Sequence, residues 1–200
     1  MPGEASDEDL MHLVAGGNEA ALRELIARYA TPLRRFVVRH GVDRDADDLC
    51  QEAWLRVVRS AARFDRARRF STWLFQITVN LCRDWHRRRH DEPVGDGAES
   101  AASRGGEVGA SPIAGREVGS TAATEASLDA RRLLAALPEA QRSVLLLRYY
   151  HGFSEAEAAE ILGCPRGTVK SRLHQAVARL LALEGADPQP GGRKQEPDRR

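Results

Sequence analysis

The segment Phe153–Leu181, FSEAEAAEILGCPRGTVKSRLHQAVARLL, decides the fold, because it predicts two helices joined by a sharp turn. Ser154 and Glu157 have the spacing of a capping box, in which each side chain accepts a hydrogen bond from the other residue's backbone N–H. Gly163 can adopt the left-handed conformation that turns the chain, and Pro165 can open the second helix. A helix-turn-helix has a small residue where its two helices approach, a glycine in the turn and a branched residue at the helix crossing. Ala159, Gly163 and Val169 occupy these positions.

The second helix of this motif separates apolar from polar residues. Its inner face is predicted to carry Val169, Leu173, Ala176, Val177 and Leu180. Groups that suit base edges in a DNA major groove lie on its outer face, namely Lys170, Ser171, His174 and Gln175. The candidates for holding DNA phosphates are Arg148, Arg166, Thr168 and Arg172. An ordinary bundle with a solvated polar face is the alternative, but the agreement of cap, turn, core spacing and basic face favours DNA binding.

The N-terminal half of the chain predicts further helices. Asn18 is expected to cap a helix that ends near Tyr29. Thr31 and Pro32 are expected to begin another helix, which Gly41 ends.

Two longer helices follow in the same half. One begins at Asp43 or Asp45, and its apolar stripe is predicted to comprise Ala46, Leu49, Cys50, Ala53, Trp54, Val57, Val58 and Ala61. Ser71 is expected to cap the other helix, whose buried face is predicted to comprise Leu74, Ile77, Thr78, Leu81 and Trp85. No stretch alternates with period two over the length of a strand, so the predicted fold class is all-α.

The 200 residues divide into segments of different composition. A stretch rich in Gly, Ala, Ser and acidic residues, 91–126, predicts a flexible linker between modules at 1–90 and 127–184. The polar stretch 185–200 predicts a disordered tail. The net charge is only +1, but residues 61–90 carry eight basic and two acidic side chains. The C-terminal region also has a basic surplus, so two contacts with a polyanion are indicated.

Several classes of function find no support in the sequence. No phosphate-binding glycine loop, dinucleotide fingerprint or nucleophile elbow occurs, so neither enzymatic activity nor a cofactor is expected. His86 and His90 have a spacing that suits a metal, but no further ligand is suitably placed, and no metal is expected. Three widely spaced cysteines, an acidic N-terminus and the lack of a long apolar run predict a cytoplasmic protein that does not insert in a membrane. A redox role for Cys50 and Cys82 stays open.

Three segments in this order resemble the extracytoplasmic-function (ECF) sigma factors of bacterial RNA polymerase. DADDLCQEAWLRVV, residues 45–58, resembles the helix that binds the polymerase clamp. FDRARRFSTWLFQITVNLCRDWHRRR, residues 64–89, resembles the segment that opens and reads the minus-ten promoter element. Residues 137–180 resemble the region that reads the minus-35 element. The resemblance implies two helical modules, sigma regions 2 and 4, joined by a linker.

The resemblance also implies a site on each segment. Binding to the clamp of the largest catalytic subunit is expected from Asp47, Asp48, Gln51, Glu52 and Arg56. Minus-ten DNA is expected to meet Arg63, Phe64, Arg66, Arg68, Arg69, Phe70, Trp73, Asn80, Arg83 and Arg87. For the aromatic members, stacking on bases and packing in the core are both open. The base-edge and phosphate candidates of the helix-turn-helix become the minus-35 site.

The implied partners are core RNA polymerase, through its clamp and the flap of its second-largest subunit, promoter DNA in duplex and single-stranded form, and an anti-sigma factor. Ala158 departs from the family, which usually has a larger aliphatic residue there, and the linker is longer than in many members. The tail is expected to be too short for a folded extra domain. A stand-alone helix-turn-helix regulator is the alternative function, although it accounts only for the C-terminal module. A protein–protein adaptor is a third, which the basic outer face disfavours.

Overall fold

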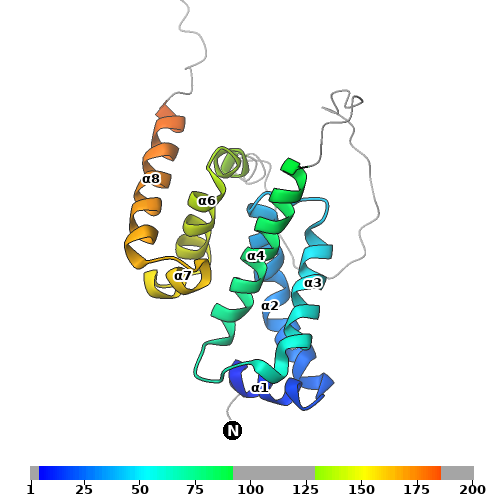
Figure 1. Cartoon of the computed structure of the whole chain (residues 1–200). Coiled ribbons are helices and arrows are strands. Elements are labelled where there is room, and N and C mark those ends of the chain that lie inside the picture. The colour runs from blue at the N-terminus through cyan, green and yellow to red at the C-terminus, as the bar shows by residue number, and fades with distance from the viewer. Residues whose placement is uncertain (1–4, 92–128, 186–200) are drawn as a thin grey trace, which may run out of the picture.

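The computed structural model describes residues 5–91 and 129–185, and every structural statement below concerns those residues (Figure 1). They form helices joined by turns, with no strand among them, which confirms the all-α prediction. Nearly all of the predicted linker, 91–126, and of the predicted tail, 185–200, lies outside the described residues. We refer to 5–91 as the first module and to 129–185 as the second module.

The first module is a helical bundle. Its elements are α1 (Asp7–Ala15), α2 (Glu19–Arg39), α3 (Ala46–Ser60), the 3-10 helix η1 (Ala61–Arg63) and α4 (Phe70–Asp91). The sequence analysis did not anticipate α1, which Ser6 caps by accepting a hydrogen bond from the backbone N–H of Asp9 (3.1 Å). α1 packs on α2 and buries Leu10, Met11 and Val14. It closes the end of the bundle at which α4 begins (Figure 1).

α2 is one continuous helix, so the prediction of two helices separated at Thr31 and Pro32 is wrong. Asn18 caps the helix as predicted, because its side-chain oxygen accepts hydrogen bonds from the backbone N–H groups of Ala20 and Ala21. Pro32 lies inside the helix. Buried residues on both sides of this proline continue one face, namely Ala21, Leu25, Leu33, Phe36 and Val37. Packing of that face outweighs the one backbone hydrogen bond that a proline removes.

α3 and α4 largely follow the predicted pattern, but α4 begins at Phe70, so Ser71 lies inside the helix and the prediction that it caps α4 is wrong. α3 begins after Asp45, whose carboxylate accepts a hydrogen bond from Trp85 Nε1 (2.7 Å). Its buried residues are Ala46, Leu49, Ala53 and Val57. Val58 is 45% exposed, so its assignment to the apolar stripe is wrong: it points about 100° around the helix from its buried neighbour Val57. In α4 the predicted core residues Leu74, Thr78 and Leu81 are buried, while Ile77 and Trp85 are partly buried.

The second module contains the predicted helix-turn-helix. Its elements are a helical stretch at 129–135, α6 (Glu139–Leu145), the π-helical turn η2 (Leu146–Tyr150), α7 (Glu155–Leu162) and α8 (Arg166–Gly185). The capping box is present, because Ser154 Oγ accepts from the N–H of Glu157 (3.2 Å) and Glu157 Oε2 accepts from the N–H of Ser154 (2.8 Å). Gly163 adopts a φ of 63° between α7 and α8.

The two modules pack against each other, an arrangement that the sequence analysis does not predict. α4 lies between α3 of its own module and α7 of the other (Figure 1). Phe75 of α4 is at the centre of the apolar contact: its ring centroid lies 5.1 Å from that of Phe153 and 4.7 Å from that of His151. Phe75 and Phe153 are 2% and 7% exposed. The buried apolar residues of both modules therefore form one hydrophobic core.

Arg142 of α6 forms the main polar contact between the modules. It is 8% exposed, and its Nη1 donates a hydrogen bond to the backbone carbonyl of His40 at the end of α2 (2.6 Å). Its other nitrogens donate to the carbonyl oxygens of Leu134 (2.8 Å), Ala135 (3.0 Å) and Leu137 (2.9 Å). Gly41, predicted to end α2, has a φ of 99°, and a Cβ there would lie 2.7 Å from Arg142 Nη1. Glycine at this position permits both the turn and the close approach of the guanidinium.

The His40 side chain is fully buried in the same contact. Its Nε2 lies 2.7 Å from Ser143 Oγ, and because that hydroxyl donates to the carbonyl of Glu139 (2.9 Å), His40 is the donor. Burial, followed by the nearby charges of His86, Arg142 and Arg83, lowers the pKa of His40 to about 3. The ring is therefore neutral when the modules are packed.

We expect the free energy of unfolding to fall on acidification because of His40. In the unfolded chain its pKa returns to about 6.5, so between about pH 6.5 and pH 3 the unfolded state binds more protons than the folded state. The full contribution of His40 to stability is present above about pH 6.5 and decreases as the pH falls. The stability lost in this way is about 2 kcal/mol at about pH 5. Denaturant titrations at several pH values measure this slope. His40→Gln should reduce the slope, and a slope equal to that of the wild type contradicts the assignment.

Candidate nucleic-acid interface

The outer face of α8 is exposed, as the sequence predicts for a base-reading surface. The four base-edge candidates are all exposed, namely Lys170, Ser171, His174 and Gln175. Val169 and Ala176 on the opposite face are 0% exposed. Buried residues thus fix the orientation of the helix, and its polar face points to solvent.

Neighbouring helices hold some of these side chains. Lys170 Nζ lies 3.7 Å from a carboxylate oxygen of Glu155 at the start of α7. Gln175 Oε1 accepts a hydrogen bond from Gln141 Nε2 of α6 (3.3 Å). Both contacts are at the surface and are weak, so either side chain can exchange them for a base edge at little cost.

The phosphate candidates are not equivalent. Arg166 is exposed, and Thr168 and Arg172 are partly buried. Arg148 instead donates a hydrogen bond to the carbonyl of Phe153, and its Nε is buried without a partner. In this structure Arg148 holds the turn before α7 and does not present its guanidinium to DNA.

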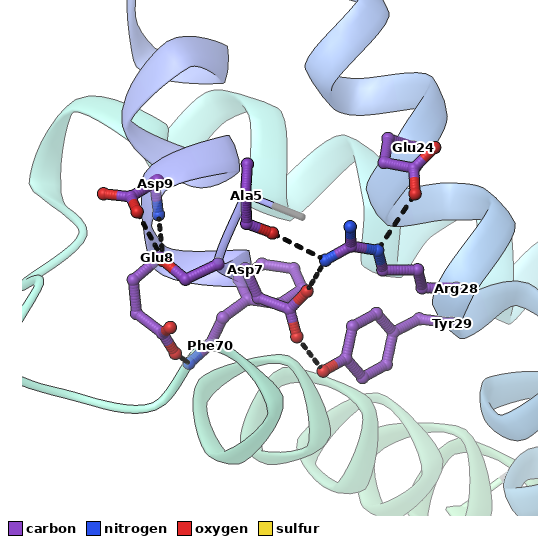
Figure 2. Close-up of polar contacts among 9 residues, drawn as sticks. Ala5, Asp7, Glu8, Asp9, Glu24, Arg28, Tyr29 and Phe70 are labelled. Carbon is purple, nitrogen blue, oxygen red and sulfur yellow. Dashed lines mark hydrogen bonds and ion pairs between the residues drawn. The ribbon is translucent and has the colours of Figure 1, made fainter. Parts of the chain in front are cut away.

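The loop 64–69, which carries much of the minus-ten candidate site, is anchored by α1. Figure 2 shows Glu8 directed at the start of α4, where its Oε1 accepts a hydrogen bond from the N–H of Phe70 (2.9 Å). Asp7 accepts from Arg28 Nη1 (2.7 Å) and from the hydroxyl of Tyr29 (Figure 2). Burial and the Asp7 carboxylate raise the pKa of Tyr29, so the hydroxyl keeps the proton that it donates. These bonds join α1, α2 and α4 and set the position of the loop.

The three aromatic candidates divide between core and surface. Phe70 is 0% exposed and packs edge-to-face on Tyr29, with ring centroids 5.4 Å apart. Phe70 is therefore a core residue, and the stacking role that the sequence left open for it is not available in this structure. Phe64 and Trp73 are partly buried, and their ring centroids lie 5.0 Å apart. These two rings are the remaining stacking candidates.

Most of the minus-ten arginines are paired with carboxylates. Arg66 pairs with Asp9 of α1, and Arg87 with Asp84 one turn away (2.9 Å). Three more pair with the second module, namely Arg68 with Glu160, Arg69 with Glu157 and Arg83 with Glu139. Arg63 and Asn80 are exposed. The loop and α4 thus place the predicted cations together, but much of their charge is already engaged.

The outer face of α3 carries the polymerase-binding candidates. Asp47 accepts from Arg34 Nε of α2 (2.8 Å), and Glu52 accepts from Arg56 Nε on the same helix (2.9 Å). Asp48 and Gln51 are exposed. The apolar residues Leu55 and Val58, 49% and 45% exposed, share the outer surface of the helix, a feature that the sequence analysis missed.

Other kinds of site find no support among residues 5–91 and 129–185. No group of three or more His, Cys, Asp or Glu side chains there is arranged to hold a metal ion. None of the helices described is both long and apolar enough to cross a bilayer. Burial raises the pKa of the Cys50 thiol to about 11 and raises that of fully buried Cys82 as well, so neither favours the reactive thiolate.

Comparison with protein families assigns both modules. Residues 25–92 match the family described as Sigma-70 region 2, and residues 127–180 match Sigma-70, region 4. The first match contains α3 and α4, and the second contains the helix-turn-helix.

Relatives are similar over almost the whole chain. The ECF RNA polymerase sigma factor SigM of Mycobacterium tuberculosis is 33% identical over 183 residues, covering 91% of this chain and 86% of its own length. The RNA polymerase sigma factor CnrH of Cupriavidus metallidurans is 32% identical, covering 94% and 98%.

Solved structures agree with the fold. CnrH in complex with the cytosolic domain of CnrY has a TM-score of 0.69 at 28% identity and covers 92% of this chain and 100% of its own. The sigma factor RpoE in complex with the anti-sigma factor NepR from Bartonella quintana has a TM-score of 0.62 at 26% identity, covering 83% and 98%. These similarities favour a sigma factor over a stand-alone regulator, since both modules are present in order. The chain therefore belongs to the ECF sigma factors, the non-catalytic subunits that bind core RNA polymerase and direct promoter-specific initiation of transcription.

Proposed function

We propose that α8 reads the minus-35 element in the major groove, with Lys170, His174 and Gln175 at base edges and Arg166 on the backbone. The exposed polar face of α8 carries this proposal, because the capped and tightly turned α7–α8 unit holds it rigidly. In the major groove, guanine presents two acceptors that suit a lysine, and adenine presents a donor and an acceptor that suit a glutamine. Ser171 and Arg172 complete the surface.

For the minus-ten element, we propose that Phe64 and Trp73 stack on unpaired bases and that Asn80 bonds a base edge. The arginines of loop 64–69 and of α4 would hold the phosphates of the single strand, as stacking surfaces and cationic grooves do in other single-strand binders.

For the polymerase, we propose that the outer face of α3 binds the clamp, with exposed Leu55 and Val58 at the centre of a charged rim. Charged rims set orientation and association rate, and a buried apolar centre supplies affinity. We further propose that the second module contacts the flap of the polymerase, that the modules are divided within 91–126, and that the protein acts in the cytoplasm. Control by an anti-sigma factor is also proposed, because CnrH and RpoE were solved in complex with CnrY and with the anti-sigma factor NepR.

The test of this function is run-off transcription with purified core polymerase on a library of promoter fragments. Transcripts that depend on this protein and share spaced minus-35 and minus-ten elements are expected. The proposed function is contradicted if the core enzyme responds to a known sigma factor but not to this chain, and if the chain alone binds duplex DNA tightly.

Two substitutions on α8 separate base contacts from phosphate contacts. Gln175→Ala should weaken promoter binding by about 1–3 kcal/mol, and with it initiation. It should also relax the preference for one base pair of the minus-35 element. Arg166→Ala should weaken all promoters evenly and lower the salt dependence of binding. Run-off assays on promoters varied at each minus-35 position measure both effects. A uniform loss in both variants would show that Gln175 does not read sequence.

A further inference from the structure

We propose that Glu8 of α1 is a positioning residue for the minus-ten site, because it holds the start of α4, where the stacking candidate Trp73 lies. The inference rests on the function proposed above, in which Phe64, Trp73 and the arginines of loop 64–69 meet the single strand. α1 lies outside both family matches, so neither match gives it a role.

Glu8 caps α4 from another helix. The first backbone N–H groups of a helix have no partner within it, and its first turn carries a partial positive charge that suits a carboxylate. Phe70 is the first residue of α4, and its N–H donates to Oε1 of the partly buried Glu8 (2.9 Å; Figure 2). A capping side chain usually belongs to a residue next to the helix, but Glu8 precedes Phe70 by 62 positions. The start of α4 is therefore fixed to α1 as well as to its own loop.

α1 also contacts the middle of loop 64–69. The Asp9 carboxylate pairs with Arg66, and Ser6 fixes that carboxylate by donating from its hydroxyl to Asp9 Oδ2 (2.7 Å). Both side chains of the Asp9–Arg66 pair are 54% exposed, so the pair is weak and a DNA phosphate can replace Asp9. The Glu8 bond differs, because it uses a backbone N–H and so occupies none of the side chains proposed to bind DNA.

The position of the start of α4 decides how the two stacking candidates lie relative to each other. Trp73 is in the first turn of α4, and its ring centroid lies 5.0 Å from that of Phe64 at the other end of the loop. Met11 and His12 of α1 line the same cavity of about 420 Å³ as Phe64. α1 is thus next to both ends of the loop. Rings that are already held in place lose less conformational entropy when they take up a strand.

Other contacts keep α1 itself on the bundle. Leu10, Met11 and Val14 are buried, and Asp7 accepts hydrogen bonds from Arg28 Nη1 (2.7 Å) and from the hydroxyl of Tyr29, both on α2. These contacts remain when the side chain at position 8 is shortened. We therefore expect a substitution of Glu8 to leave α1 in place and to release only the start of α4.

The experiment compares Glu8→Ala and Glu8→Gln in the full chain, bound to core polymerase, at a promoter found by run-off transcription. Glutamine keeps the length of the side chain and an oxygen that can accept from the N–H of Phe70. The matched control is Glu19→Ala, which removes an exposed acid from the first turn of α2. The rate of promoter opening is followed by the fluorescence of an aminopurine base placed in the minus-ten element. Affinity for a duplex that carries only the minus-35 element is measured in parallel, and circular dichroism checks that each variant is folded.

We expect Glu8→Ala to open the promoter about tenfold more slowly than the wild type, the usual effect of losing a hydrogen bond to a charged group. Glu8→Gln and Glu19→Ala should stay within about threefold of the wild-type rate. The minus-35 affinity should be the same in all variants, which a general loss of structure would not allow. Wild-type opening by Glu8→Ala, opening by Glu8→Gln as slow as by Glu8→Ala, or an equal fall in minus-35 affinity overturns the proposal. In each of these cases the wild type still initiates, whereas a wild type that does not initiate means that the proposed function has failed as well.

Discussion

Alanine at Phe70 is expected to lower the free energy of unfolding by about 3–5 kcal/mol, the usual cost of removing a buried phenylalanine. The ring is 0% exposed at the junction of α1, α2 and α4. Its centroid lies 5.4 Å from that of Tyr29, 6.1 Å from that of Phe64 and 6.2 Å from that of Trp73. Alanine therefore leaves a cavity among these rings, and Tyr29 is held in place beside it by its hydrogen bond to Asp7.

Denaturant titration measures this effect, and Phe70→Leu is the matched variant, since it restores most of the volume. Leucine should recover most of the stability and also the initiation activity. If Phe70→Leu were as stable as the wild type but unable to open promoters, the ring would act on DNA and the assignment to the core would be wrong.

Alanine at Arg142 should cost about 3 kcal/mol, because it removes a donor from four backbone carbonyls in a largely buried site. The carbonyl of His40 keeps its contact with His86 Nε2 (3.1 Å), and that of Leu134 keeps the N–H of Leu137 (3.2 Å). Three of these carbonyls lie in 134–137 and the fourth belongs to His40. We therefore expect the loss to affect both the end of the 129–135 helix and the contact between the modules. Arg142→Lys should restore little, since one ammonium group cannot reach carbonyls on several sides.

The control is Arg132→Ala, whose side chain is 82% exposed and pairs with Asp129 one turn away. That substitution should change the free energy of unfolding by less than about 0.5 kcal/mol. Small-angle scattering on Arg142→Ala adds a second readout, an increased radius of gyration. An Arg142→Ala protein as stable and as compact as the Arg132→Ala control would contradict the role given to this side chain.

Local chemistry made the helix-turn-helix predictable from sequence. The capping box at Ser154 and Glu157 and the left-handed Gly163 depend on residues within ten positions of one another, and the structure contains both. The alternation of buried and exposed residues in α8 follows from the helical period alone. For the same reason the candidate base-reading face was predictable residue by residue.

Sequence patterns did not suffice where packing by residues distant in the chain decides whether a helix continues or a side chain is buried. Pro32 interrupts a helix by its local chemistry, but the buried face of α2 continues through it. For Phe70 the sequence left stacking and core packing both open, and contacts with Tyr29 of α2 and Glu8 of α1 decide for the core.

The sequence by itself therefore determined an all-α protein with a helix whose polar face is exposed and a cluster of arginines, because caps, turns and helical periods act over a few residues. Only the tertiary structure decided what those arginines touch. Arg68 and Glu160 are separated by 92 positions, and so no local pattern pairs them. Packing of Phe75 on Phe153 and of Arg142 on the end of α2 brings the two modules together, and the ion pairs follow from that packing.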